Sequence, residues 1–140
     1  MAGLLEGRSA LVVGASSGIG REIALTMAAA GASLSLLARN AEKLQELAEL
    51  CRQEGAAAVA VYSVDLEDRL ALSAAADDII AAQGAVHVLV NNSGGPPGGP
   101  LLEASEQDFL KPLTRHLFAS HFLVQRLVGG MKAAGYGRIL

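Results

Sequence analysis

Three glycines follow a short apolar run near the start of the chain, in the order Val12-Val13-Gly14-Ala15-Ser16-Ser17-Gly18-Ile19-Gly20. The run 10–13 predicts a buried strand, and a helical pattern begins directly after the glycines. Free backbone N–H groups and the positive end of a helix dipole both face such a turn, so it can bind an anion. The sequence therefore predicts a phosphate site here, although a glycine-rich loop that only joins two elements has the same composition.

The spacing of these glycines is GxxxGxG, which differs from the GxGxxG of many dinucleotide sites but serves the same three tasks. Gly14 allows a sharp turn off the strand, Gly18 allows a pyrophosphate close to the backbone, and Gly20 allows close packing of helix on sheet. Ser16 and Ser17 add hydroxyl donors beside them. We therefore predict that this turn holds the pyrophosphate of a dinucleotide.

The elements that must position this turn follow from hydrophobic periodicity and from capping residues. Short apolar runs predict five strands, of which the last begins where the chain stops: 10–13, 34–38, 57–64, 86–90 and 138–140. Amphipathic patterns predict four helices between them: 18–30, 41–54, 67–83 and 112–131. Asn40 is a candidate N-cap for the second helix, Ser105 with Asp108 fits a capping box, and Pro112 suits the first turn of the fourth helix.

Apolar side chains at helical spacing mark the face that each helix should bury. The predicted buried positions are Ile19, Ile23, Met27 and Ala30 in the first helix, Leu44, Leu47 and Cys51 in the second, Leu72, Ala75, Ala76, Ile79 and Ile80 in the third, and Leu113, Leu117, Val124, Val128 and Met131 in the fourth. Cys51 is the only cysteine, and we interpret it as a packing residue and not as a nucleophile.

Strands that alternate with helices predict an α/β fold, a doubly wound parallel sheet with right-handed crossovers and the strand order 3-2-1-4-5. No linker, repeat or low-complexity tract divides residues 1–140, so we expect them to form a single NAD(P)-binding domain, incomplete in its fifth strand. In such a sheet the ligand lies across the carboxyl ends of the strands.

Each of the first four strands ends in residues suited to one part of a dinucleotide. Strand two ends at Arg39, and no acidic residue lies between Gly31 and Asn40 to bind ribose hydroxyls, so a 2′-phosphate and NADP are favoured over NAD. The alternative is an ordinary surface arginine. Asp65 after strand three could accept from the adenine amine, or could simply cap the next helix. The amides and glycine of 91–94 after strand four can reach a ribose.

Composition excludes several other function classes. The chain is 51% hydrophobic, as buried parallel sheets are, but it has only 4% aromatic residues and no Trp. The net charge of −3 and the scarcity of aromatic rings argue against nucleic-acid binding. One cysteine excludes an internal disulfide and fits a reducing cytoplasm. No secretory signal, membrane-length apolar run or metal site is predicted.

These residues together make the chain resemble the large classical group of the short-chain dehydrogenase/reductase family, nearest to the 3-oxoacyl-(acyl-carrier-protein) reductases, over essentially all 140 residues. The resemblance implies a Rossmann sheet, NAD or NADP, hydride transfer between nicotinamide and a carbonyl or alcohol carbon of a small molecule, and a homo-oligomer in the full-length form. The cofactor contacts it implies are Gly14, Ser16, Ser17, Gly18, Ile19, Gly20, Arg39, Asp65, Leu66, Asn92, Ser93 and Gly94.

The three histidines depart from the family pattern or lie on the last helix. His116 falls where the family has an asparagine that holds a proton-relay water, and it is our one candidate catalytic residue, because a histidine can also hold water and pass protons. His87 replaces an acidic residue before strand four, and we interpret it as a surface variation. His121 is predicted to pack partly buried in the helix.

The family's catalytic serine, tyrosine and lysine are absent from this chain. The tyrosine is followed four residues later by a lysine that lowers its pKa, but Leu66 follows Tyr62 and Leu140 follows Tyr136 at that spacing. We therefore expect the chain alone to be inactive and poorly stable. A non-catalytic dinucleotide-binding module and an inert fragment are the alternatives to an oxidoreductase.

Overall fold

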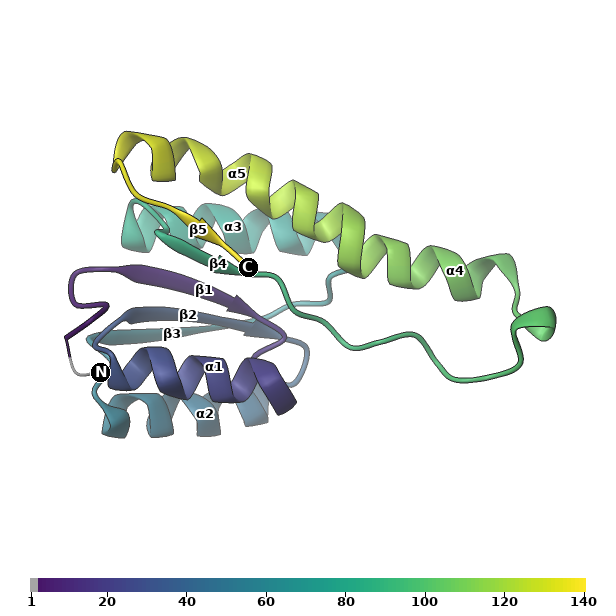
Figure 1. The fold of residues 1–140 in the computed structure, drawn as a ribbon, viewed down its shortest axis with the longest axis horizontal. Coiled ribbons are helices and arrows are strands. Elements are labelled where there is room, and N and C mark those ends of the chain that lie inside the picture. The colour runs from purple at the N-terminus through teal and green to yellow at the C-terminus, as the bar shows by residue number, and fades with distance from the viewer. Residues whose placement is uncertain (1–2) are drawn as a thin grey trace.

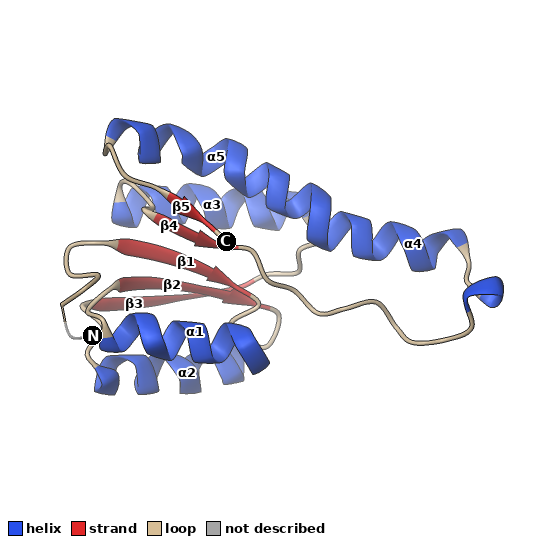
Figure 2. Ribbon diagram, in the orientation of Figure 1, coloured by secondary structure: helices blue, strands red, loops and turns tan. Residues whose placement is uncertain are grey.

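The computed structural model describes residues 3–140, which form a parallel sheet with helices on both faces (Figure 2). The strands are β1 (Ser9–Val13), β2 (Ser33–Ala38), β3 (Ala58–Ser63), β4 (Val88–Val90) and β5 (Arg138–Ile139). The helices are α1 (Gly18–Ala29), α2 (Ala41–Glu54), α3 (Arg69–Gln83), η1 (Leu101–Glu103), α4 (Glu106–Leu113), η2 (Thr114–Phe118) and α5 (Ala119–Ala133). The strand order is β3-β2-β1-β4-β5 with parallel pairing throughout, which confirms the predicted topology.

Helices cover both faces of the sheet, so the central strand β1 and its neighbour β4 are buried at every position and not at alternate ones. Along β1, Ala10 and Val12 face one cluster with α1 and α2, whereas Leu11 and Val13 face another with α3 and α5. Figure 1 shows the same two layers, with α1 and α2 below the sheet and α3 and α5 above it. Because the strands are parallel, the residues that follow them all lie at the same edge of the sheet.

The first three helices lie where the sequence predicts them, with small shifts at their ends. Asn40 caps α2 by accepting from the Lys43 N–H, and Gly55 ends it in the left-handed region. The third helix begins at Arg69 and not at 67, because Asp68 provides the cap. The alternative interpretation of Asp65, as the N-cap of this helix, is therefore wrong.

Burial of α1 differs from the prediction at its start. Ile19 is 74% exposed, and the residues that α1 buries are Gly20, Ala24 and Ala28. The predicted Ile23 and Met27 pack partly buried against the same core, whereas Ile19 lies outside it and lines the cleft described below.

The last predicted helix is the main error. Residues 106–113 already form α4, capped by a Ser105–Asp108 capping box, and Pro112 lies near the end of that helix and not in its first turn. A π-helical turn, η2, separates α4 from α5 and shifts the register, so the buried stripe is Ala119, Leu123, Leu127 and Met131. Of the predicted stripe only Met131 is buried, and Leu113 and Leu117 are exposed.

Two histidines also differ from their predicted settings. His121 is exposed on α5 and not partly buried. His87 is half-buried, and its Nδ1 accepts from the Ser9 N–H at 3.0 Å, so it joins β1 to β4 and is more than a surface variation.

Candidate functional site

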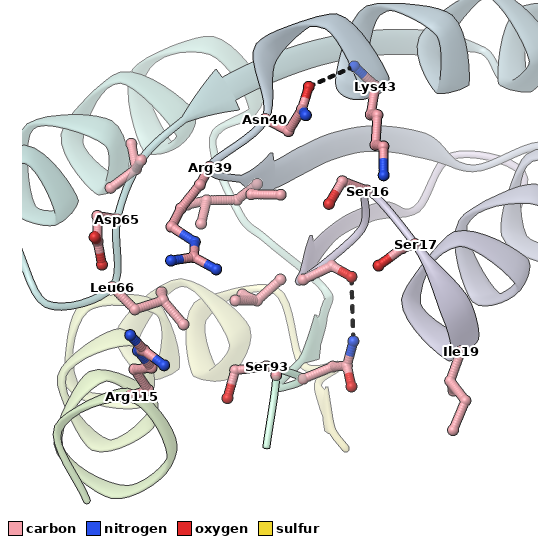
Figure 3. A pocket seen from close by; sticks show the side chains of 17 residues that line it. Ser16, Ser17, Ile19, Arg39, Asn40, Lys43, Asp65, Leu66, Ser93 and Arg115 are labelled. Carbon is pink, nitrogen blue, oxygen red and sulfur yellow. Dashed lines mark hydrogen bonds between the residues drawn. The ribbon is translucent and has the colours of Figure 1, made fainter. Parts of the chain in front are cut away.

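The carboxyl ends of the strands border a cleft of about 720 Å³ (Figure 3). Its lining includes most of the residues predicted to contact a cofactor: Gly14, Ser16, Ser17, Ile19, Arg39, Asp65, Leu66, Asn92, Ser93 and Gly94. Gly18 and Gly20 do not line it directly, and His116 lines a neighbouring smaller hollow. The cleft therefore brings together residues from four separate strand ends.

The turn after β1 fits tightly against Asn92 at the end of β4. The Asn92 side-chain amide donates to the Gly14 carbonyl oxygen at 3.2 Å. Gly14 has φ +66°, and a β-carbon there would lie 2.5 Å from the Asn92 carbonyl oxygen. A β-carbon at Gly20 would overlap the Gly14 carbonyl. Both positions therefore lack the space for a β-carbon, and only glycine fits there.

The N-terminus of α1 has no capping side chain. Ser17 occupies the N-cap position in an extended conformation, its side chain accepts no hydrogen bond from the described backbone, and the first turn contains no acidic residue. Helices α2, α3 and α4 each receive a side-chain cap, from Asn40, Asp68 and Ser105. The positive end of α1 therefore points at the cleft with N–H groups available to an anion.

Two cations, Arg39 and Lys43, lie near this turn, at the end of β2 and the start of α2. Figure 3 shows the Lys43 side chain extending toward Ser16, and Arg39 directed into the cleft. Within residues 3–140 neither forms an ion pair. The two cations give this part of the cleft an uncompensated positive charge that suits a phosphate.

Sequence reasoning missed Lys43 as a cleft residue. A signal was present, because Asn40 caps α2 and so places Lys43 in the helix's first turn, where the dipole disfavours a cation. A cation in this unfavourable position, directly after strand two, was the available hint that its side chain serves the cleft. Arg115 was also missed, since only the fold brings it to the cleft.

At the other end of the cleft, the turn after β3 carries Asp65 and Leu66. Asp65 Oδ1 accepts from the Glu67 N–H at 2.9 Å, which closes the turn. The Glu67 carboxylate accepts from Arg115 Nη2 at 2.6 Å and Nε at 2.9 Å. This ion pair joins the β3–α3 turn to η2 along the wall of the cleft.

The π-helical turn η2 also carries His116, which contacts the loop after β4. Its Nε2 lies 3.0 Å from the Gly94 carbonyl oxygen, so Nε2 donates, and Nδ1 of the neutral ring accepts from the Ser93 hydroxyl at 2.8 Å. The hollow of about 100 Å³ beside it is also lined by Asn91 and Ser120. The Asn91 Oδ1 is buried there and accepts no hydrogen bond from residues 3–140.

The strand order and the turn after β1 define the class of protein, a Rossmann-type α/β fold. Residues 8–140 match the family described as short chain dehydrogenase. The chain belongs to the short-chain dehydrogenase family.

Individual relatives support the same assignment. The chain is 37% identical over 137 residues to the 7alpha-hydroxysteroid dehydrogenase of Escherichia coli K12, covering 97% of this chain and 52% of the relative. The L-sorbose reductase of Gluconobacter frateurii, complexed with NADPH and L-sorbose, superposes with a TM-score of 0.92 at 30% identity, over 99% of this chain and 53% of that one. A 7alpha-hydroxysteroid dehydrogenase complexed with NADH and 7-oxo glycochenodeoxycholic acid gives 0.89 at 34% identity, over 96% and 52%. The chain thus spans about half the length of these relatives.

The helices of residues 3–140 are too short or too polar to cross a membrane.

Proposed function

We propose that this chain binds NADP in the cleft and serves as the cofactor-binding part of an oxidoreductase that transfers hydride between nicotinamide and the carbonyl or alcohol carbon of a small molecule. The preference for NADP depends on one observation: Arg39 and Lys43, beside the start of α1, are two cleft cations that pair with no carboxylate of residues 3–140. A 2′-phosphate adds negative charge to the adenosine ribose, and a free arginine offers it a bidentate partner.

The donor set of the cleft fits each part of this cofactor. Backbone N–H groups at the start of α1 and the Ser16 and Ser17 hydroxyls suit the pyrophosphate, because a cradle lined by Gly14 leaves the backbone accessible. Asn92 and Ser93 suit a ribose. His116 lines the small hollow beside Ser93 and is the proposed holder of a proton-relay water, a role that requires its ring to exchange the contact with Ser93 or with Gly94 for that water.

The relatives support the cofactor class but not the choice between its two members. One similar structure is complexed with NADPH and a sugar, and another with NADH and a bile acid. The preference for NADP therefore depends on this chain's own residues, and the substrate is proposed only as a small carbonyl or alcohol.

Titration of the 140-residue chain with NADPH and NADH tests the proposal. We expect tighter binding of NADPH, and we expect Arg39→Ala to weaken NADPH binding about tenfold or more, since a charge-assisted hydrogen bond contributes about 1.5–3 kcal/mol. NADH binding should change little. Arg52→Ala is the matched control, because Arg52 is an exposed arginine that pairs with Glu49 on α2.

Two results would contradict the proposal. Failure of the folded chain to bind either nucleotide would remove the cofactor assignment altogether. An equal loss of NADPH and NADH affinity in Arg39→Ala would remove the 2′-phosphate role and leave Arg39 as a general contact. Circular dichroism of the same samples establishes that each variant is folded.

A further inference from the structure

The ion pair between Arg115 and Glu67 lies on the wall of the cleft at the end that holds Asp65 and Leu66. Figure 3 shows the Arg115 guanidinium beside Leu66, with Asp65 and Arg39 on the same side of the cleft. Arg115 lies in η2, far along the chain from the β3–α3 turn. The wall at this end of the cleft is therefore completed by a residue that does not follow a strand.

Arg115 has a carboxylate partner, unlike the other two cleft cations. Its Nε and Nη2 both donate to Glu67 Oε2, at 2.9 and 2.6 Å, whereas Arg39 and Lys43 pair with no carboxylate of residues 3–140. The carboxylate compensates the guanidinium charge locally. Besides the N–H groups of Nη1, Arg115 offers the cleft a flat face, and a guanidinium whose charge is already compensated binds a neutral aromatic ring better than a second phosphate.

The position of Arg115 is also fixed in advance. The two side chains are only 23% and 30% exposed, and two hydrogen bonds hold the guanidinium plane. Glu67 itself is anchored, since its backbone N–H donates to Asp65 Oδ1. A group ordered before the ligand arrives loses little conformational entropy on binding.

We propose that Arg115, held flat by Glu67, is the platform on which the purine ring of the dinucleotide stacks. This inference rests on the proposed function. Leu66 supplies an apolar contact beside the ring, and the Asp65 carboxylate can accept from an exocyclic amine. Glu67 is a positioning residue, and Arg115 touches the base, which is common to NADPH and NADH.

The test compares Kd values for NADPH and NADH in the wild-type chain and in Arg115→Ala, at the same ionic strength. Stacking on the base predicts that Arg115→Ala weakens both nucleotides by the same factor, about fivefold to tenfold. Arg115→Lys keeps the charge and can still reach Glu67, but it has no flat face, so it should not restore affinity. Arg126→Ala is the matched control, because Arg126 pairs with Asp77 away from the cleft, and it should bind as the wild type does.

Selective loss of NADPH in Arg115→Ala would overturn the inference, because it would make Arg115 a phosphate ligand. Rescue by Arg115→Lys, wild-type affinity in Arg115→Ala, or an equal loss in Arg126→Ala would also overturn it. If Arg115→Ala does not fold, Arg115→Lys carries the comparison alone, with weakened binding of both nucleotides expected. Binding of neither nucleotide by the wild type would instead show that the proposed function itself has failed.

Discussion

Gly20 illustrates at the residue scale how the cleft depends on missing side-chain atoms. It is buried where α1 meets the sheet, and a β-carbon there would overlap the Gly14 carbonyl and lie 2.7 Å from the Asn92 side-chain nitrogen. The Gly14 backbone and the hydrogen-bonded Asn92 amide both lie against Gly20, so α1 would have to move away from the sheet to accommodate a side chain. The glycine therefore sets the distance between α1 and the strand ends that border the cleft.

Gly20→Ala should lower both stability and nucleotide affinity. Overpacking of this kind costs about 1–3 kcal/mol of unfolding free energy, more than the alanine gains in helix propensity. Urea denaturation and NADPH titration measure the two effects. Gly129→Ala is the control: Gly129 lies in α5, and a β-carbon added there would meet no atom within 4 Å, so alanine should stabilise by up to about 1 kcal/mol. A Gly20→Ala chain as stable as the wild type would contradict the close packing.

His87 makes the stability of the chain depend on pH. Burial first, and then the Arg8 guanidinium, lower the pKa of His87 below its ordinary value of 6.5. The folded state thus binds this proton less readily than the unfolded chain does, and the Nδ1 must be free of a proton to accept from Ser9 N–H. The contribution of His87 to stability is complete above pH 6.5 and is lost as the pH falls through 6.5 toward the lower folded pKa.

His87→Asn should reduce this acid sensitivity, because an asparagine oxygen can still accept from Ser9 and does not titrate. The measurement is the urea midpoint at a pH above and a pH below 6.5, compared between variant and wild type. The exposed His121 provides the control variant His121→Asn, which should lose stability on acidification as the wild type does. Equal acid sensitivity of His87→Asn and the wild type would exclude His87 as the source.

At the scale of elements, the difference between predicted and observed structure is concentrated in the last helix. Strands and helices up to α3 have local signals, such as the Asn40 cap and the glycine that ends α2, and these agree with the packing. The η2 turn has no comparable signal. Pro112 deprives the Asp108 carbonyl of a donor, but the contacts that η2 makes through Arg115 and His116 are with loops distant in the sequence.

The cleft residues divide in the same way. Arg39 and Asp65 follow strands directly, so the rule that ligands lie at strand ends predicts their place in the cleft. Arg115 lies within η2 and follows no strand, and its partner Glu67 is 48 residues away in the sequence. Pairings of this kind follow from the fold and from no local pattern in the sequence.

His116→Ala should loosen the contact between η2 and the loop after β4. It removes the hydrogen bonds to Ser93 and Gly94, and we expect a loss of about 1 kcal/mol in stability. Faster amide hydrogen exchange in residues 93–95 is the specific readout. His121→Ala, a change at an exposed histidine of α5, should leave this exchange unaltered. Unchanged exchange in His116→Ala would mean that other contacts hold the loop.

On the scale of the whole molecule, charge and apolar surface are distributed unevenly. The chain carries a net charge of −3, yet the cations Arg39 and Lys43 line one cleft, so an anionic ligand is attracted to a small part of a negatively charged molecule. Apolar surface is concentrated instead on the segment around α4. Figure 1 shows α4 projecting beyond the sheet, and no residue of α4 is buried.

The apolar residues of this projecting segment form an unusually exposed set: Leu101, Leu102, Phe109, Leu110, Leu113, Leu117 and Phe118. Contiguous apolar surface of this kind favours association, and a second copy of the chain offers the same segment in return. We therefore expect the 140-residue chain to self-associate through α4 and η2, in a manner that depends on its concentration.

Phe109 and Leu113 lie one helical turn apart on α4 and are both exposed, so Phe109→Glu with Leu113→Glu should dissociate the assembly without disturbing the core. Sedimentation velocity over a wide concentration range measures the change, and circular dichroism checks the fold. Leu70→Glu, at an exposed leucine of α3, is the control and should leave association intact. A wild-type chain that stays monomeric at every concentration would contradict the expectation, because the α4 segment would then have no affinity for its own copy. Equal dissociation by Leu70→Glu would contradict it as well, because the effect of the α4 substitutions would then not be specific to that segment.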